Sequence, residues 1–179
     1  MLTRASSPLE GLVVALAFCL SFCAGSCREE RPTASGAVGV NIRALAFDPH
    51  TETPVILLAE TAGTRVLPIW IGISEARSIA AELEGPRAPR PNAHDLVGRV
   101  LRGLDGAVER VVVTELREGI YFATLTVRSG DRQIDVDARP SDAIAVALRM
   151  AAPIFVHESL FDPALSMPDV PSPEPGLQL

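Results

Sequence analysis

The run IDVDARPSDAIAVALR (134–149) constrains the fold more than any other part of the chain. Its first half alternates apolar and polar residues, which predicts a strand, and its second half is apolar enough to predict a buried helix. Pro140 suits the first helical position because its φ is preset and no N–H is lost there. Asp135 and Asp137 are two apart, so on a strand they point to the same face. We expect a strand–turn–helix junction crowded with charge, and any functional site beside it.

Strand signals and helix signals alternate along the rest of the chain. Strands are predicted over 38–47, 54–60, 65–71, 107–115, 119–128, 131–137 and 153–157. Helices are predicted from a cap at Ser74 to Gly85, from Asn92 onward, and from Pro140 to Met150. The order βββ-αα-βββ-α-β predicts an α+β domain, with three helices covering one side of a mostly antiparallel sheet.

The second predicted helix is amphipathic. Asn92 and Asp95 have the spacing of a capping box, with Asp in place of the usual Glu. One face of this helix carries apolar side chains at helical spacing, namely Leu96, Val97, Val100, Leu101 and Leu104.

The first 26 residues have the layout of a secretory signal. Arg4 precedes an apolar run over 12–24, and small residues follow before the polar segment that starts at Arg28. Cys27 follows Ala-Gly-Ser, which resembles a bacterial lipoprotein box and predicts lipidation of that cysteine. Cleavage after Ser26 without lipid, a retained anchor and a misassigned start codon remain alternatives. We expect an exported bacterial protein, either periplasmic or secreted, or lipid-anchored with membrane contact only through the lipid or leader.

The domain itself is expected over 38–161. Residues 27–37 are expected to be a flexible tether. Residues 162–179 carry five prolines among small and acidic residues, which predicts a disordered tail.

Composition narrows the possible partners. The net charge is −6 and every basic residue is arginine, so a catalytic lysine is excluded. An acidic domain does not grip duplex backbones broadly, so nucleic acid would have to be held by a local arginine cluster. Aromatic residues make up only 4% of the chain, which disfavours stacking platforms for single strands.

Three stretches together resemble the bifunctional nuclease domain family. They are LPIWIGISEARSIAAELEG (67–85), RPNAHDL (90–96) and IDVDARPSDAIAVALRMAAPIFV (134–156), and the resemblance covers 38–160. It implies an α+β fold, a homo-oligomer and nuclease activity on DNA and RNA. The family commonly has threonine before the histidine, where this chain has Ala93.

Phosphodiester hydrolysis needs an activated water, and charge stabilisation on the phosphoryl oxygens. Catalytic candidates are His94, Asp95, Asp135, Asp137 and Asp142. A divalent metal, Mg²⁺ or Mn²⁺, could be held by Asp135, Asp137 and Asp142, with Glu75 as a further ligand. Substrate contacts are expected from Arg90, Arg139 and Ser141.

The same residues also have structural explanations. Asp142 in the first turn of a helix stabilises the helix dipole, worth about 0.3–1 kcal/mol. Asp137 and Arg139 could simply pair, and charges on an edge strand protect it from pairing with another chain. A non-catalytic oligomeric binding or scaffold module with the same fold is therefore the alternative to a nuclease.

Overall fold

The computed structural model describes residues 36–85 and 89–161. The predicted leader, the predicted lipidation site Cys27 and the proline-rich tail lie outside the described residues. The strands are β1 (Ala37–Asp48), β2 (Thr53–Glu60), β3 (Val66–Trp70), β4 (Gly106–Arg117), β5 (Ile120–Ser129), β6 (Arg132–Ala138) and β7 (Ile154–His157). The helices are α1 (Ile73–Glu84), α2 (Ala93–Gly103), α3 (Pro140–Met150) and the short 3₁₀ helix η1 (Glu158–Phe161).

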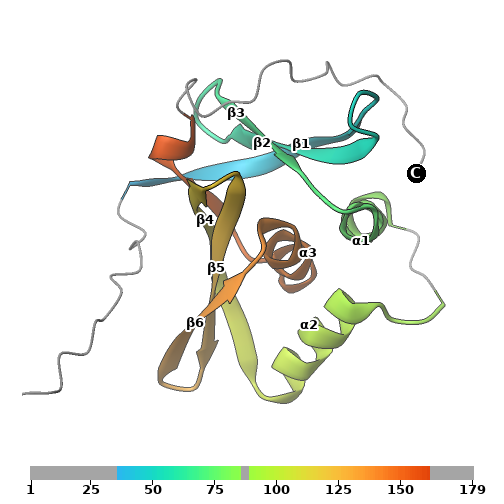
Figure 1. The fold of residues 1–179 in the computed structure, drawn as a ribbon. Coiled ribbons are helices and arrows are strands. Elements are labelled where there is room, and N and C mark those ends of the chain that lie inside the picture. Colours follow the sequence, from blue (N-terminus) through green and yellow to red (C-terminus); the bar gives the residue numbers. More distant parts are fainter. Residues whose placement is uncertain (1–35, 86–88, 162–179) are drawn as a thin grey trace, which may run out of the picture. The chain divides into compact units, whose positions relative to one another are not determined.

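All seven strands form one sheet in the order β3-β2-β1-β7-β4-β5-β6 (Figure 1). The four-residue β7 lies at its centre, antiparallel to β1 and parallel to β4. Every other pairing is antiparallel. The predicted α+β class with a mostly antiparallel sheet is confirmed, and β7 joins an N-terminal meander to a second meander that starts after α2.

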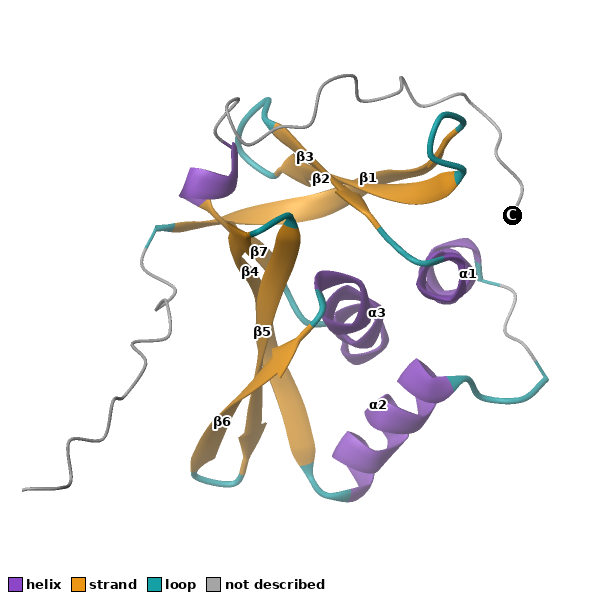
Figure 2. Cartoon of the chain, in the orientation of Figure 1, coloured by secondary structure: helices purple, strands orange, loops and turns teal. Residues whose placement is uncertain are grey.

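The helix α3 lies between α1 and α2, beside the strands β4 to β6 (Figure 2). It is buried on almost every side, with a continuous buried run from Ala143 to Ala147. Ile144 is fully buried in the same core as Val111 and Leu125 of the sheet. Such an all-round apolar helix needs neighbours on several sides, which the sheet and the other two helices provide.

The helix starts follow local chemistry. Asn92 caps α2 with the predicted capping box, and Pro140 occupies the first turn of α3. The predicted cap at Ser74 is wrong by two positions, because α1 begins after Gly72, a residue that has no side chain with which to cap the helix. Glu118 and Gly119 both have positive φ, which matches the tight turns that join twisted hairpin strands such as β4 and β5.

The apolar face of α2 lies toward solvent rather than toward the core. Leu96, Val97, Val100 and Leu104 are 41 to 67% exposed, whereas Gly98 is buried and Leu101 packs against the core. Amphipathic spacing predicted the helix, but it did not predict which face the domain would bury.

Within residues 36–85 and 89–161, no helix combines the length and apolar character needed to cross a bilayer.

Candidate active site

The hydroxyl of Ser78 joins the three helices. Ser78 lies on α1 and is 5% exposed. Its Oγ lies 2.9 Å from Nδ1 of His94, 3.0 Å from Nδ2 of Asn92 and 3.0 Å from Nη2 of Arg149. Because these partners belong to the start of α2 and the end of α3, one buried oxygen links α1 to both of the other helices.

These contacts determine where the protons lie. Asn92 Oδ1 accepts from the backbone N–H of Asp95, so its amide nitrogen faces Ser78 as a donor. Arg149 can only donate. Both lone pairs of the Ser78 oxygen are therefore occupied, and its single proton must go to His94 Nδ1. The neutral imidazole then carries its proton on Nε2, which donates to Asp142 Oδ1 at 3.1 Å.

The resulting chain of hydrogen bonds has the connectivity of a Ser-His-Asp triad. Ser78 nevertheless does not have the exposure of a nucleophile, because it is buried beneath α2 and already accepts two hydrogen bonds. A phosphodiester would reach its oxygen only if α1 and α2 separated. In the described conformation, the hydrogen bond between Ser78 and His94 is a structural connection between α1 and α2.

The end of this hydrogen-bond network at Arg139 and Asp142 is more open to solvent. Arg139 Nε donates to Asp142 Oδ2 at 2.7 Å, and Arg139 Nη2 donates to Glu75 Oε1 at 3.1 Å. The side chains of Arg139 and Asp142 are 69% and 32% exposed. Burial alone would raise the pKa of Asp142, but the hydrogen bonds from Arg139 and His94 outweigh it, so the pKa lies below its ordinary value.

The other end of the network is an ion pair between α2 and α3. Arg149 Nε donates to Asp95 Oδ1 at 2.6 Å, and the Arg149 side chain is only 5% exposed. Arg149 also donates to the carbonyls of Ala145 and Ser78. Partial burial opposes ionisation of Asp95, but hydrogen bonds from Arg149 and from the backbone of Asn92 keep its pKa below the ordinary value.

Two predicted catalytic aspartates lie elsewhere. Asp135 and Asp137 are exposed on β6 opposite Thr126 and Thr124 of β5, and Thr126 Oγ1 donates to Asp135. Their neighbour Val136 lies opposite the core residue Leu125. Since successive side chains of a strand alternate, the two aspartates point to the face away from the helices.

The predicted carboxylate cluster is therefore not present. Asp135 and Asp137 share one face of the sheet, while Asp142 and Glu75 lie on the helix side and are bridged by Arg139. Among the residues that the structure describes, no group of three potential ligands is placed to hold a metal ion. The proposed Asp135–Asp137–Asp142 ligand set does not fit Mg²⁺ or Mn²⁺, because its members point to opposite faces.

Arg90 and Ser141, the two other residues predicted to contact the substrate, differ in exposure. Arg90 is exposed in the segment before α2. Ser141 is 7% exposed in the first turn of α3, a burial that does not suit contact with a substrate.

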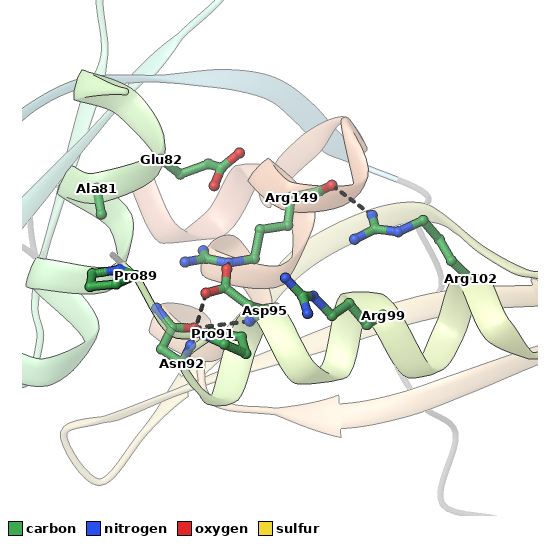
Figure 3. Close-up of a pocket in the computed structure, with 9 residues that line it drawn as sticks. All are labelled: Ala81, Glu82, Pro89, Pro91, Asn92, Asp95, Arg99, Arg102 and Arg149. Atoms are coloured by element: carbon green, nitrogen blue, oxygen red, sulfur yellow. Dashed lines mark hydrogen bonds and ion pairs between the residues drawn. The ribbon is translucent and has the colours of Figure 1, made fainter. Parts of the chain in front are cut away.

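A pocket of about 350 Å³ lies at the Asp95 end of the network, between α1, α2 and α3 (Figure 3). The charged residues that line it are Glu82, Asp95, Arg99, Arg102 and Arg149. Sequence reasoning identified only Asp95 of these. A polar Ser78 within the buried stripe of α1, and arginines three apart on α2, are the signals that could have indicated the network and the pocket.

We expect Ser78→Ala to lower the free energy of unfolding by about 1–3 kcal/mol, because the amide of Asn92 and the buried guanidinium of Arg149 lose their shared acceptor. Urea denaturation followed by circular dichroism measures this loss. Ser74→Ala is the matched control, since Ser74 is exposed on the same helix. Its expected change is within about 0.5 kcal/mol. Equal effects of the two substitutions would contradict a stabilising role for the Ser78 hydroxyl.

Comparison with known proteins identifies the domain. The family model described as the bifunctional nuclease domain matches residues 56–167. The uncharacterized protein Rv1829 of Mycobacterium tuberculosis is 42% identical over 131 residues, which are 73% of this chain and 78% of that protein.

Plant relatives are more distant. Bifunctional nuclease 1 of Oryza sativa subsp. japonica is 28% identical over 133 residues, 68% of this chain and 40% of that protein. Bifunctional nuclease 1 of Arabidopsis thaliana is 30% identical over 118 residues, 64% of this chain and 35% of that protein. The resemblance found in the sequence is confirmed, and it assigns the chain to a family of nuclease enzymes. The chain belongs to the bifunctional nuclease domain family.

Proposed function

We propose that the chain is an exported nuclease that hydrolyses phosphodiester bonds of DNA and RNA with low sequence selectivity. The family match and the names of the rice and Arabidopsis relatives support the activity. We place the active site at Arg139 and Asp142, because both side chains reach solvent while their ion pair holds them in place. Contacts to phosphate carry no sequence information, which agrees with low selectivity.

In this proposal Arg139 binds the substrate phosphate. Its Nε and Nη2 are engaged by Asp142 and Glu75, while no described residue accepts a hydrogen bond from Nη1. A non-bridging phosphate oxygen would bind at Nη1, where the guanidinium charge offsets the charge that develops in the transition state.

Asp142 would orient the attacking water and take its proton. As the water oxygen forms a bond to phosphorus, the P–O ester bond breaks and the leaving oxygen takes a proton from solvent. His94 acts as a positioning residue, since its Nε2 donates to Asp142 Oδ1 and holds the carboxylate in place.

We assign no divalent cation to a site made only of described residues. Glu75 and Asp142 are two carboxylates near one another, and Mg²⁺ commonly binds one or two carboxylates together with substrate phosphates. Hydrolysis rates measured with a chelator present, and again after Mg²⁺ or Mn²⁺ is added back, show whether a divalent cation contributes to catalysis.

We expect Asp142→Asn to slow hydrolysis by about 100-fold or more, the usual range for loss of a general base. Initial rates on fluorescently labelled single-stranded DNA and RNA measure the change. Asp137→Asn is the matched control, because this exposed aspartate lies on the opposite face of the sheet and should keep the wild-type rate. Loss of activity in the Asp137 variant alone would place the centre on β6 and overturn the proposal.

The export and lipid anchor rest on the leader sequence, with Cys27 as the lipidated residue. We expect the protein, expressed in bacteria, to incorporate labelled palmitate and to partition into the detergent phase, and Cys27→Ala to lose both properties. Absence of the label, with a mature N-terminus at Cys27, would instead indicate simple cleavage after Ser26.

A non-catalytic oligomeric module remains a second candidate, and one specific observation favours it. Leu96, Val97 and Val100 of α2 and Leu104, its C-cap residue, are exposed apolar side chains that recur at helical spacing and form an apolar stripe. Soluble monomers rarely expose such a stripe, which is typical of interaction surfaces. We propose that it contacts a second copy of the chain, so that a homo-oligomer forms with or without catalysis.

We expect Val100→Glu with Leu104→Glu to convert the oligomer to a monomer, because two buried charges would oppose the contact. Light scattering after size-exclusion chromatography measures the mass, and circular dichroism checks the fold. Ile120→Glu is the control, since Ile120 is equally exposed but lies on the β4–β5 hairpin. A monomeric wild-type protein would contradict this proposal.

A further inference from the structure

We propose that the pocket lined by Arg99, Arg102 and Arg149 binds a backbone phosphate of a single-stranded nucleic acid. This inference rests on the proposed nuclease function and adds a second phosphate contact beside the one at Arg139. Asp95 and Arg149, the ion pair at one end of the hydrogen-bond network, are part of the pocket lining (Figure 3). Arg139 and Asp142 form the other end of the network.

The charges in the pocket favour an anion. Three arginines and two carboxylates line it. Arg149 is already neutralised by Asp95, through the 2.6 Å ion pair. Arg102 uses Nη1 to donate to the Arg149 carbonyl and to the sulfur of Met150, which orients its guanidinium at the pocket rim.

Arg99 is the arginine of the pocket that is most available to a ligand. It is exposed, and it makes no hydrogen bond with any residue that the structure describes. Its charge is near enough to Asp95 to contribute to the lowered pKa of that carboxyl. Arg99 and Arg102 are three apart, so both project from the same side of α2, where two guanidinium groups can bind the oxygens of one phosphate.

The size of the pocket and its uncharged lining residues favour the sugar–phosphate backbone of a nucleic acid, rather than a base, as the bound group. A volume of about 350 Å³ is at the small end of ligand sites, and suits one phosphate with its sugar. Ala81, Pro89 and Pro91 provide the apolar part of the lining, with no aromatic ring on which a base could stack. A phosphate contact without stacking strengthens binding equally for every sequence.

The spacing along α3 allows one strand to reach both ends of the network. Asp142 and Arg149 are seven residues apart, about 10 Å along a helix axis. A nucleic acid strand rises about 3.4 Å per nucleotide in a duplex, so this separation corresponds to about three nucleotides. Cleavage at Arg139 and retention at Arg99 would then involve phosphates about three nucleotides apart on one strand.

Fluorescence anisotropy of a hydrolysis-resistant, fluorescein-labelled phosphorothioate 12-mer with the full-length protein tests this inference. We expect Arg99→Gln to weaken binding several-fold, and to reduce the slope of log K against log salt by about one. Arg102→Gln should weaken binding similarly. Arg77→Gln is the matched control, an exposed arginine on α1 outside the pocket, and should bind as the wild type does.

The outcomes separate this inference from the proposed function. Hydrolysis by the wild type, with equal binding by the Arg99, Arg102 and Arg77 variants, would overturn the pocket and leave the nuclease intact. Binding that depends on Arg99 but comes without hydrolysis would support the pocket and overturn the nuclease. Equal melting temperatures for Arg99→Gln and the wild type exclude unfolding as the cause.

Displacement of the 12-mer by millimolar inorganic phosphate in the wild type, but not in Arg99→Gln, supports a phosphate site. A wild-type protein that binds inorganic phosphate but does not bind the 12-mer would overturn the nucleic acid as ligand.

Discussion

The arrangement of the three helices depends on a buried hydroxyl whose hydrogen-bonding capacity is fully used. Ser78 accepts from α2 and α3 and gives its one proton to His94, so none of these partners can rotate without leaving a buried polar group unsatisfied. The geometry also explains an unusual feature of α2. That helix is held through Asn92, His94 and Asp95 rather than through its apolar stripe, and the stripe remains outside.

The same network divides into a closed middle and two open ends. In the middle, the Ser78–His94–Asp142 connection resembles a catalytic triad but is packed between helices. Arg139 at one end and Arg99 at the other are exposed cations, each next to a carboxylate that the network holds ionised. An acidic protein can attract a polyanion in this way, since locally concentrated arginines act over short distances even where the net charge is negative.

Much of the fold was predictable because its signals are local. The Asn92–Asp95 capping box, Pro140 at a helix start and the alternation along 134–137 each involve residues within one turn or strand. The candidate site was predictable only in part. His94, Asp142, Arg139, Glu75 and Asp95 do meet in one network, whereas Asp135 and Asp137 point away from it. Sequence proximity brought these two aspartates into the prediction, and the side-chain alternation of β6 removed them from the site.

The sequence by itself determined the order of strands and helices, the starts of α2 and α3 and the family, since periodicity, caps and motifs depend on neighbouring residues. Tertiary structure alone decided that the four-residue β7 is the central strand, that α2 exposes its apolar face and that Ser78 is the shared acceptor. Each of these depends on residues tens of positions apart, such as Ser78 and Arg149. Strand pairing, the choice of buried face and the satisfaction of buried hydrogen bonds are settled only when the whole core packs, because each group takes the partner that the others leave available.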